Sequence, residues 1–118
     1  MKHIQLQNDG TPIDLPDARL CYFENFFSAA EAIYLFNQLN NKIPWQQDPI
    51  TIFGKTYNQP RLTALHANNS NPYSYSGITM YPNEMTAELT EIQNRITSVT
   101  PVKFTSVLLN LYRDGKDS

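Results

Sequence analysis

Apolar side chains occupy both faces of one stretch near the carboxyl end of the sequence. From Phe104 to Tyr112, β-branched and aromatic residues are dense and no glycine or proline interrupts them, which predicts a strand. Because successive side chains of a strand point to opposite faces, Asn110 and Tyr112 share one face. Both faces are largely apolar, so we expect the strand to be covered on both sides.

Two amphipathic patterns predict helices. Ser28 and Glu31 form a capping-box pair, so the first helix is expected to begin there and to run to about residue 40. Pro82, with Asn83 as a candidate cap, is expected to begin the second. Apolar residues recur at helical spacing and are expected to be buried. They are Ala32, Leu35, Phe36, Leu39 and Ile43 in the first pattern, and Met85, Leu89, Ile92, Ile96 and Val99 in the second.

Extended segments are expected between the helices. Residues 50–53 and 55–57 predict a hairpin, and residues 61–66 predict a further strand. An asparagine-rich loop at residues 67–71 precedes an aromatic segment at residues 72–77, where extended structure is expected to resume.

The first 19 residues are polar and contain Pro12 and Pro16. They predict a loosely ordered lead-in with a short turn at residues 8–10, followed by a short strand from Leu20 to Phe23. Residues 20–118 are expected to form the structured part of the chain. Overall, 41% of the sequence is hydrophobic and 17% is charged, which is typical of a globular rather than a disordered protein.

Composition narrows the classes of protein. The net charge of −2 argues against a strong electrostatic grip on nucleic acid by this stretch alone, without excluding nucleic acid. Cys21 is the single cysteine, which excludes an internal disulfide and fits a reducing, cytoplasmic location. No apolar run approaches the length of a membrane span, and the N-terminus lacks the apolar core of a signal peptide.

Two motifs carry a resemblance to a known family. Residues 60–64 (PRLTA) are followed by residues 73–77 (YSYSG), and after a predicted helix come residues 110–118 (NLYRDGKDS). The last resembles the NxYxxGxD segment of the AlkB family, iron(II) and 2-oxoglutarate-dependent dioxygenases that demethylate nucleic-acid bases. The resemblance covers roughly residues 23–118. It implies an α+β fold, in which two helices pack on part of a double-stranded β-helix (jelly roll) that is incomplete at the C-terminus.

The resemblance also implies binding residues. Asn110 and Tyr112 would bind 2-oxoglutarate, since amide and phenol donors suit a carboxylate. The spacing alone favours an ordinary buried pair bonded to the backbone. Tyr75, with Tyr73 and Ser76, would belong to a lid over a flipped-out base, where stacking contributes about 1–3 kcal/mol per base. The alternative is an aromatic hairpin packed on the core.

Other candidate residues have open or structural interpretations. Arg61 could contact a phosphate or the substrate base, or it could anchor the lid to a carboxylate. Trp45 and Phe53 are interpreted as packing residues rather than recognition residues. Asp114 and Asp117 are interpreted as turn-forming surface residues rather than metal ligands.

The metal ligands of the family are not found in this sequence. In the family an HxD motif follows the last motif within a few residues, and a second histidine lies much further on. The two histidines here, His3 and His66, have no acidic residue at that spacing, and His66 is expected to be exposed to solvent. The 2-His-1-carboxylate iron site cannot be built in the family's way, so we assign no catalytic residue and expect this stretch to be inactive alone.

The function implied for the parent protein is oxidative removal of alkyl groups from bases of DNA or RNA, with Fe(II) and 2-oxoglutarate as cofactors. The alternative is a metal-free module that binds nucleic acid or a protein through the tyrosine platform, and a purely structural domain is a third possibility. The last strand is expected to present an unpaired edge, through which the chain could associate with itself.

Overall fold

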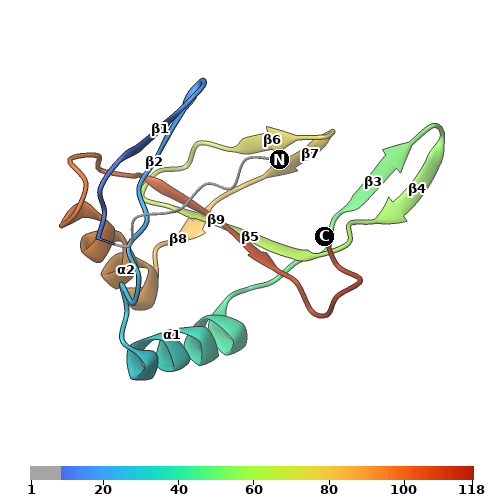
Figure 1. Cartoon of the computed structure of the whole chain (residues 1–118). Coiled ribbons are helices and arrows are strands. Elements are labelled where there is room, and N and C mark those ends of the chain that lie inside the picture. Colours follow the sequence, from blue (N-terminus) through green and yellow to red (C-terminus); the bar gives the residue numbers. More distant parts are fainter. Residues whose placement is uncertain (1–8) are drawn as a thin grey trace. The chain divides into compact units, whose positions relative to one another are not determined.

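The computed structural model describes residues 9–118, which form a mixed α+β structure. Contacts divide the chain into two compact units, one ending at Asn37 and the other running from Gln38 to Ser118. Each unit contains its own hairpins, drawn in Figure 1. No helix within residues 9–118 is long and apolar enough to cross a lipid bilayer.

A hairpin occupies part of the segment that was predicted to be loosely ordered. Strand β1 (Ile13–Leu15) pairs antiparallel with β2 (Ala18–Leu20). Pro16 restricts φ in the connecting turn, and Asp17 adopts a left-handed φ of 60°, which aspartate tolerates better than most residues. The expectation of a loose lead-in is wrong for this hairpin, because the turn chemistry of the Pro-Asp pair was not recognised.

Two other predictions for the start of the chain concern a turn at residues 8–10 and a strand at residues 20–23. Residues 1–8 lie outside the described part of the chain. In the described part of the predicted turn, Asp9 Oδ1 accepts hydrogen bonds from the Thr11 backbone N–H at 3.0 Å and from its hydroxyl at 2.6 Å. The strand predicted for residues 20–23 overlaps the observed strand only at its first residue.

Helix α1 (Ala29–Lys42) begins where the capping box predicted. The Glu31 backbone N–H donates to Ser28 Oγ at 3.1 Å, and the Ser28 N–H donates to Glu31 Oε1 at 3.0 Å, so the predicted cap is confirmed. Its predicted apolar stripe holds only in part. Leu35 is buried, whereas Ala32 and Phe36 are exposed.

The predicted hairpin of the second unit is confirmed. Strand β3 (Pro49–Ile52) pairs antiparallel with β4 (Lys55–Asn58), and the hairpin extends away from the central sheet (Figure 1). Both residues of its two-residue turn have left-handed backbones, with φ of 50° at Phe53 and 76° at Gly54. Such turns match the twist of the flanking strands, and glycine adopts this conformation without strain.

A three-stranded sheet organises the second unit. Its central strand β5 (Leu62–Ala67) pairs antiparallel with β9 (Ser106–Leu111) and parallel with the short β8 (Asn83–Glu84). Ala64 lies opposite Leu109 in the antiparallel ladder. Strand β5 is buried over nearly its whole length, and β9 forms an outer edge of the sheet.

Alternation along β5 places neighbouring residues in two separate cores. The first core contains Ile43, Ala64 and Leu89, on which Trp45 and Leu109 pack. It lies on the sheet face covered by helix α2 (Ala87–Thr97) and by residues at the end of α1.

The second core lies on the opposite sheet face. It contains Leu65 together with Ile78 and Met80, and Ile50 and Tyr75 pack against it. The hairpin of β6 (Tyr73–Tyr75) and β7 (Ile78–Met80) therefore covers this face of β5.

On β9, the sheet face that carries the second core is left open. The expectation that the terminal strand is covered on both faces is therefore wrong. Leu108 is 39% exposed and Asn110 and Tyr112 are exposed, whereas the intervening residues are half-buried. The β6–β7 hairpin packs on Leu65 of β5, whereas Leu108, opposite Leu65 in the ladder, stays exposed.

The start of helix α2 also differs from the prediction. Thr86, not Asn83, is the N-cap, and its hydroxyl accepts from the Leu89 N–H at 3.2 Å. Asn83 instead lies in β8, where its side-chain amide donates to the Leu65 carbonyl at 3.0 Å. Pairing with β5 outweighs the local capping signal, so the helix begins later than Pro82.

Candidate functional site

The two sequence motifs meet along one pair of strands. Thr63 of the first motif lies opposite Asn110 of the second in the β5–β9 ladder. Beyond β9 the chain turns back, and the Ser118 backbone N–H donates to the Pro60 carbonyl at 2.8 Å. Segments that are far apart in the sequence therefore form one structural unit.

Asn110 and Tyr112 lie at the open face of β9. Exposed and half-buried residues alternate along the strand, and Asn110 shares the exposed side with Leu108, while Tyr112 follows the strand directly and is 53% exposed. Their amide N–H and phenol O–H groups are donors of the kind that a carboxylate accepts. The arrangement leaves both groups available to a ligand.

Thr63 adds a polar group that the sequence analysis missed. It lies opposite Asn110, so the two side chains share a sheet face. Its side chain is fully buried, and its Oγ1 has no hydrogen-bond partner within the described chain. The available signal was a threonine between two apolar residues, Leu62 and Ala64.

Tyr75 is anchored at its hydroxyl. The buried Gln59 amide donates to the Tyr75 hydroxyl at 2.9 Å, and that hydroxyl lies 3.3 Å from Gln59 Oε1. Its ring packs against the second core, and its centroid lies 5.6 Å from that of Tyr73. Gln59 was not singled out from the sequence, where only its position next to the first motif distinguishes it.

Tyr73 and Ser76 are more accessible than Tyr75. Tyr73 is 47% exposed, and Ser76 is exposed in the turn between β6 and β7 with a left-handed φ of 48°. The Ser74 hydroxyl lies 3.1 Å from that of Thr79, on the other face of the hairpin.

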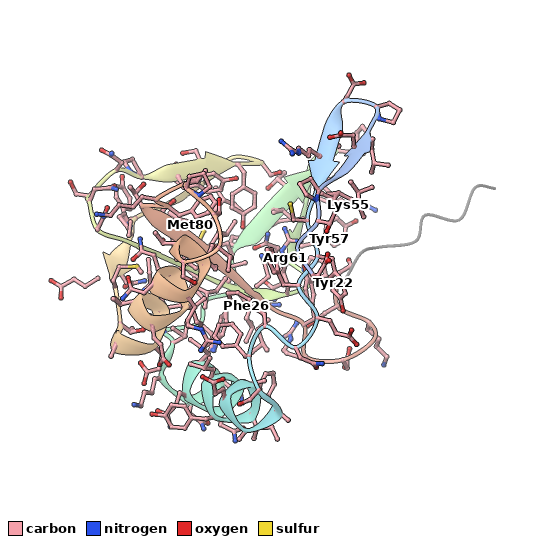
Figure 2. The ribbon with its side chains drawn as sticks, turned by 60° about the vertical axis from the view of Figure 1, so that its left-hand side comes forward. Tyr22, Phe26, Lys55, Tyr57, Arg61 and Met80 are labelled. Atoms are coloured by element: carbon pink, nitrogen blue, oxygen red, sulfur yellow. The ribbon has the colours of Figure 1, made fainter. Side chains whose placement is uncertain are left out.

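Arg61 contacts the backbone of the second motif. Its Nη1 donates to the Ser118 carbonyl at 3.2 Å, and its Nε is buried without a partner in the described chain. Of the predicted roles, an anchoring role fits this contact, although the partner is a carbonyl rather than a carboxylate. The Arg61 side chain is labelled in Figure 2.

The turn after β9 is held by an ion pair. Arg113 Nε donates to Asp117 Oδ2 at 2.7 Å, its Nη2 donates to Oδ1 at 3.1 Å, and its backbone N–H also donates to Oδ2 at 2.9 Å. These bonds lower the pKa of Asp117, mainly through the Arg113 side chain, and raise that of Arg113. The bidentate geometry supports the predicted turn-forming role of Asp117.

His66 is buried, so its predicted exposure to solvent is wrong. It is 2% exposed, Nδ1 lies 2.7 Å from the Glu84 carbonyl, and Nε2 has no partner within the described residues. The side chain alternates onto the face of the first core, which the sequence could not reveal without the register.

Phe53 does not pack, contrary to its predicted role. It is fully exposed in the β3–β4 turn, where its side chain has no core to contact. Trp45 is half-buried against the first core, as predicted for a packing residue, and its indole N–H donates to the Asn40 carbonyl at 3.3 Å.

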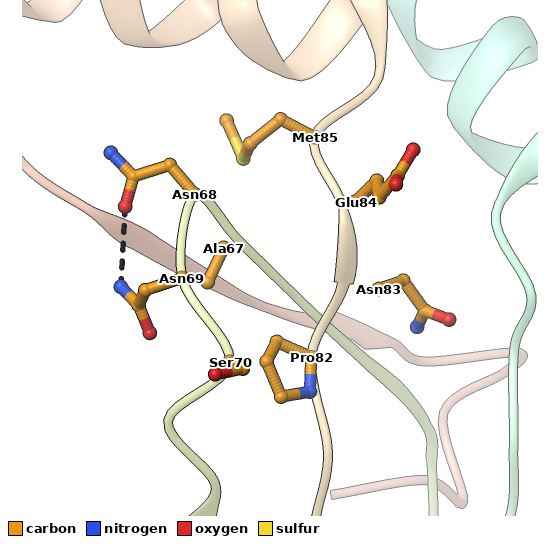
Figure 3. A pocket seen from close by; sticks show the side chains of 8 residues that line it. All are labelled: Ala67, Asn68, Asn69, Ser70, Pro82, Asn83, Glu84 and Met85. Carbon is orange, nitrogen blue, oxygen red and sulfur yellow. Dashed lines mark hydrogen bonds between the residues drawn. The ribbon is translucent and has the colours of Figure 1, made fainter.

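A hollow of about 410 Å³ lies where the loop after β5 meets β8, and Figure 3 shows the residues that line it. Its amides already bond within the chain. Asn69 Nδ2 donates to Asn68 Oδ1 at 3.2 Å, and Asn69 Oδ1 accepts from the Asn71 backbone N–H at 3.0 Å. These bonds account for the polar groups as loop-forming residues.

Comparison with known proteins defines the class. A family model described as the 2OG-Fe(II) oxygenase superfamily matches residues 19–118. The chain therefore belongs to the 2OG-Fe(II) oxygenase superfamily.

Relatives within the superfamily are of the AlkB type. The chain is 41% identical over 102 residues to human alpha-ketoglutarate-dependent dioxygenase alkB homolog 3. The matched region makes up 86% of the chain and 35% of that protein. It is 30% identical over 100 residues to DNA oxidative demethylase ALKBH2 of Bos taurus, a match that makes up 82% of the chain and 36% of that protein. The Arabidopsis thaliana DNA oxidative demethylase ALKBH2 is 33% identical over 108 residues, a match that makes up 83% of the chain and 32% of that protein. The AlkB-family resemblance is confirmed, and the chain spans about a third of the length of these relatives.

The residues present fit the two family cofactors differently. Asn110 and Tyr112 are exposed and carry donor groups of the kind that the carboxylates of 2-oxoglutarate accept, whereas the neighbouring Thr63 is fully buried. Within residues 9–118, no group of three or more His, Cys, Asp or Glu side chains could hold a metal ion. The described residues therefore do not fit an iron site, and no chemical step is assigned to them.

Proposed function

We propose that this chain forms the substrate-binding and 2-oxoglutarate-contacting part of a dioxygenase that removes alkyl groups oxidatively from bases of DNA or RNA. The observation that carries the proposal is the open face of β9, where Asn110 and Tyr112 lie exposed beside the hairpin that holds Tyr75. The relatives named as dioxygenases and DNA oxidative demethylases support the reaction class.

In this proposal β5 and β9 are neighbouring strands of a jelly roll. The antiparallel β5–β9 ladder and the helix-covered face support it. The open face of β9 would form the lining of the ligand cavity, because a small diacid needs donors that are not engaged by the protein itself. Asn110 and Tyr112 would each donate to 2-oxoglutarate there.

The substrate base would be held by the β6–β7 hairpin. Tyr73 and Tyr75 offer two aromatic rings on one face, and Ser76 lies in the adjoining turn. Arg61 would stabilise the junction with the second motif rather than contact a phosphate. The fully exposed Phe53 ring supports a further contact with the nucleic-acid strand, because an exposed phenylalanine gains by burial against a partner.

Ligand titration tests the proposal. Asn110→Ala and Tyr112→Phe each remove one donor to a charged acceptor, a loss of about 1.5–3 kcal/mol, or roughly 10- to 150-fold in affinity. We expect chemical-shift titrations of this chain with 2-oxoglutarate to show weaker binding in both variants. Asn94→Ala on α2 and Tyr81→Phe are matched controls with exposed side chains away from β9.

Unchanged 2-oxoglutarate affinity in Asn110→Ala and Tyr112→Phe would refute the cofactor assignment. Turnover offers a separate test, since we propose that this chain has no iron-dependent activity alone. Succinate release by the purified chain with Fe(II), 2-oxoglutarate and a methylated oligonucleotide would contradict that part of the proposal.

A further inference from the structure

One side-chain hydrogen bond connects the two hairpins of the second unit. Gln59 directly follows β4, and its amide donates to the hydroxyl of Tyr75 in β6 at 2.9 Å. The same hydroxyl lies 3.3 Å from Gln59 Oε1, so both ends of the amide address one phenol. Gln59 is only 3% exposed, and a buried amide in this setting is held to its partner by the cost of leaving it unpaired.

The backbone of Gln59 is itself fixed. Its N–H donates to the Asp48 carbonyl at 2.9 Å, and its carbonyl accepts from Gln47 Nε2 at 2.9 Å. Gln59 therefore projects its amide from a position set by the base of the β3–β4 hairpin. Few conformations of its side chain would keep the bond to Tyr75.

The ring of Tyr75 is confined between two neighbours. One side packs against the second core around Leu65, and the Tyr73 ring lies next to it with an interplanar angle of 42°. The outer torsion of a tyrosine is broad when nothing holds the ring. The hydroxyl oxygen lies on the axis of that torsion, so the bond to Gln59 fixes where this axis points, whereas packing against the second core and the Tyr73 ring sets the plane of the ring.

We propose that Gln59 is a positioning residue for substrate recognition: by holding the Tyr75 hydroxyl, it fixes the aromatic surface that receives a nucleobase. The inference rests on the proposed function of Tyr75 and adds a residue outside the family motifs. Because the ordering cost of the ring is met during folding, a planar ligand binds with a smaller entropic penalty.

Oligonucleotide binding by a set of variants of the whole chain tests this role. The probe is a fluorescein-labelled single-stranded DNA that contains one N1-methylated adenine, and the readout is fluorescence anisotropy. Gln59→Leu removes both amide groups, Tyr75→Phe keeps the ring without its hydroxyl, and Tyr75→Leu removes the stacking surface. Tyr81→Phe is a matched control, because Tyr81 is 74% exposed and takes no part in the Gln59–Tyr75 bond.

We expect Gln59→Leu and Tyr75→Phe to weaken binding by a similar factor of about three- to tenfold, and the double variant to bind no more weakly than either single one, because the two residues act through one bond. Gln59→Glu keeps an acceptor for the phenol and should recover part of the loss. Adding Gln59→Leu to Tyr75→Leu should change the affinity no further. A residue that only stabilised the fold would weaken binding again in that background.

Two results separate the inference from the function on which it rests. If Tyr75→Leu binds the probe as tightly as the unmodified chain, the proposed stacking role is wrong and the positioning role falls with it. If Tyr75→Leu weakens binding while Tyr75→Phe and a folded Gln59→Leu do not, the function stands and the positioning role is overturned. Should Gln59→Leu fail to fold, Tyr75→Phe alone decides the matter, because it breaks the same bond and keeps the ring that packs on the second core.

Discussion

Leu65→Ala should loosen the hairpin that carries Tyr75 while leaving the helix-covered core in place. Leu65 is 3% exposed and is the residue of β5 on which Ile78 and Met80 pack. Replacing a buried leucine by alanine removes contacts and leaves a cavity, at a cost of about 2–5 kcal/mol. Because single domains have total stabilities of about 5–15 kcal/mol, the variant is expected to fold with a clearly lower urea midpoint.

Two probes distinguish the cores. Trp45 is the single tryptophan and packs on the first core, so its fluorescence reports on that side of the sheet. Native-state hydrogen exchange of the β6–β7 backbone reports on the other side. In Leu65→Ala we expect the Trp45 emission of the folded state to be unchanged, and exchange in β6–β7 to accelerate more than exchange in the β5–β9 ladder.

Leu89→Ala is the matched control, since Leu89 is 2% exposed in the first core. It should lower the urea midpoint by a similar amount but shift Trp45 emission and spare the hairpin. The reasoning would be refuted if Leu65→Ala left stability within about 0.5 kcal/mol of the unmodified chain, the range usual for neutral surface changes. Identical exchange patterns in the two variants would also contradict the existence of two separate cores.

Three further predictions concern other parts of the chain. Arg113 lowers the pKa of Asp117, so this ion pair stabilises the fold above the ordinary carboxyl pKa, and its contribution is lost as the pH falls through the lowered value. An NMR titration of the Asp117 carboxyl should show a midpoint below the ordinary one. Arg113→Gln should raise that midpoint without restoring it fully, because the backbone N–H of residue 113 still donates to the carboxylate. Thr86→Ala removes the α2 cap and should cost about 0.5–2 kcal/mol in urea unfolding, whereas Thr86→Ser should cost less, and equal losses would contradict the capping role. Strand β9 has an open edge and an exposed face, which predict that the chain associates with itself. Leu108→Lys should therefore raise the fraction of monomer measured by light scattering at high protein concentration. An unmodified chain that is already monomeric at that concentration would count against the prediction.

Signals confined to a few residues were predicted well from the sequence. The Ser28–Glu31 capping box needs only a short helical segment to form, and the β3–β4 hairpin follows from strand residues around one glycine. The terminal strand and its alternation were also predictable, because β9 contains no residue that breaks a strand.

Features that depend on distant partners were not predictable in this way. Asn83 has the properties of a helix cap, but pairing of its strand with β5 gives its amide a different acceptor. His66 is polar and stands before a loop, yet the register places it on the face of the buried first core. Gln59 has no local signal of its own, because its role depends on a phenol 16 residues further along the chain.

Strand β5 serves two compartments with side chains that are adjacent in sequence, Ala64 in one and Leu65 in the other. Deleting or inserting a single residue within it would exchange those assignments at every later position, and would send the partner of Asn110 to the wrong side. Strand β5 should therefore tolerate changes in the size of its side chains more readily than the insertion or deletion of a residue.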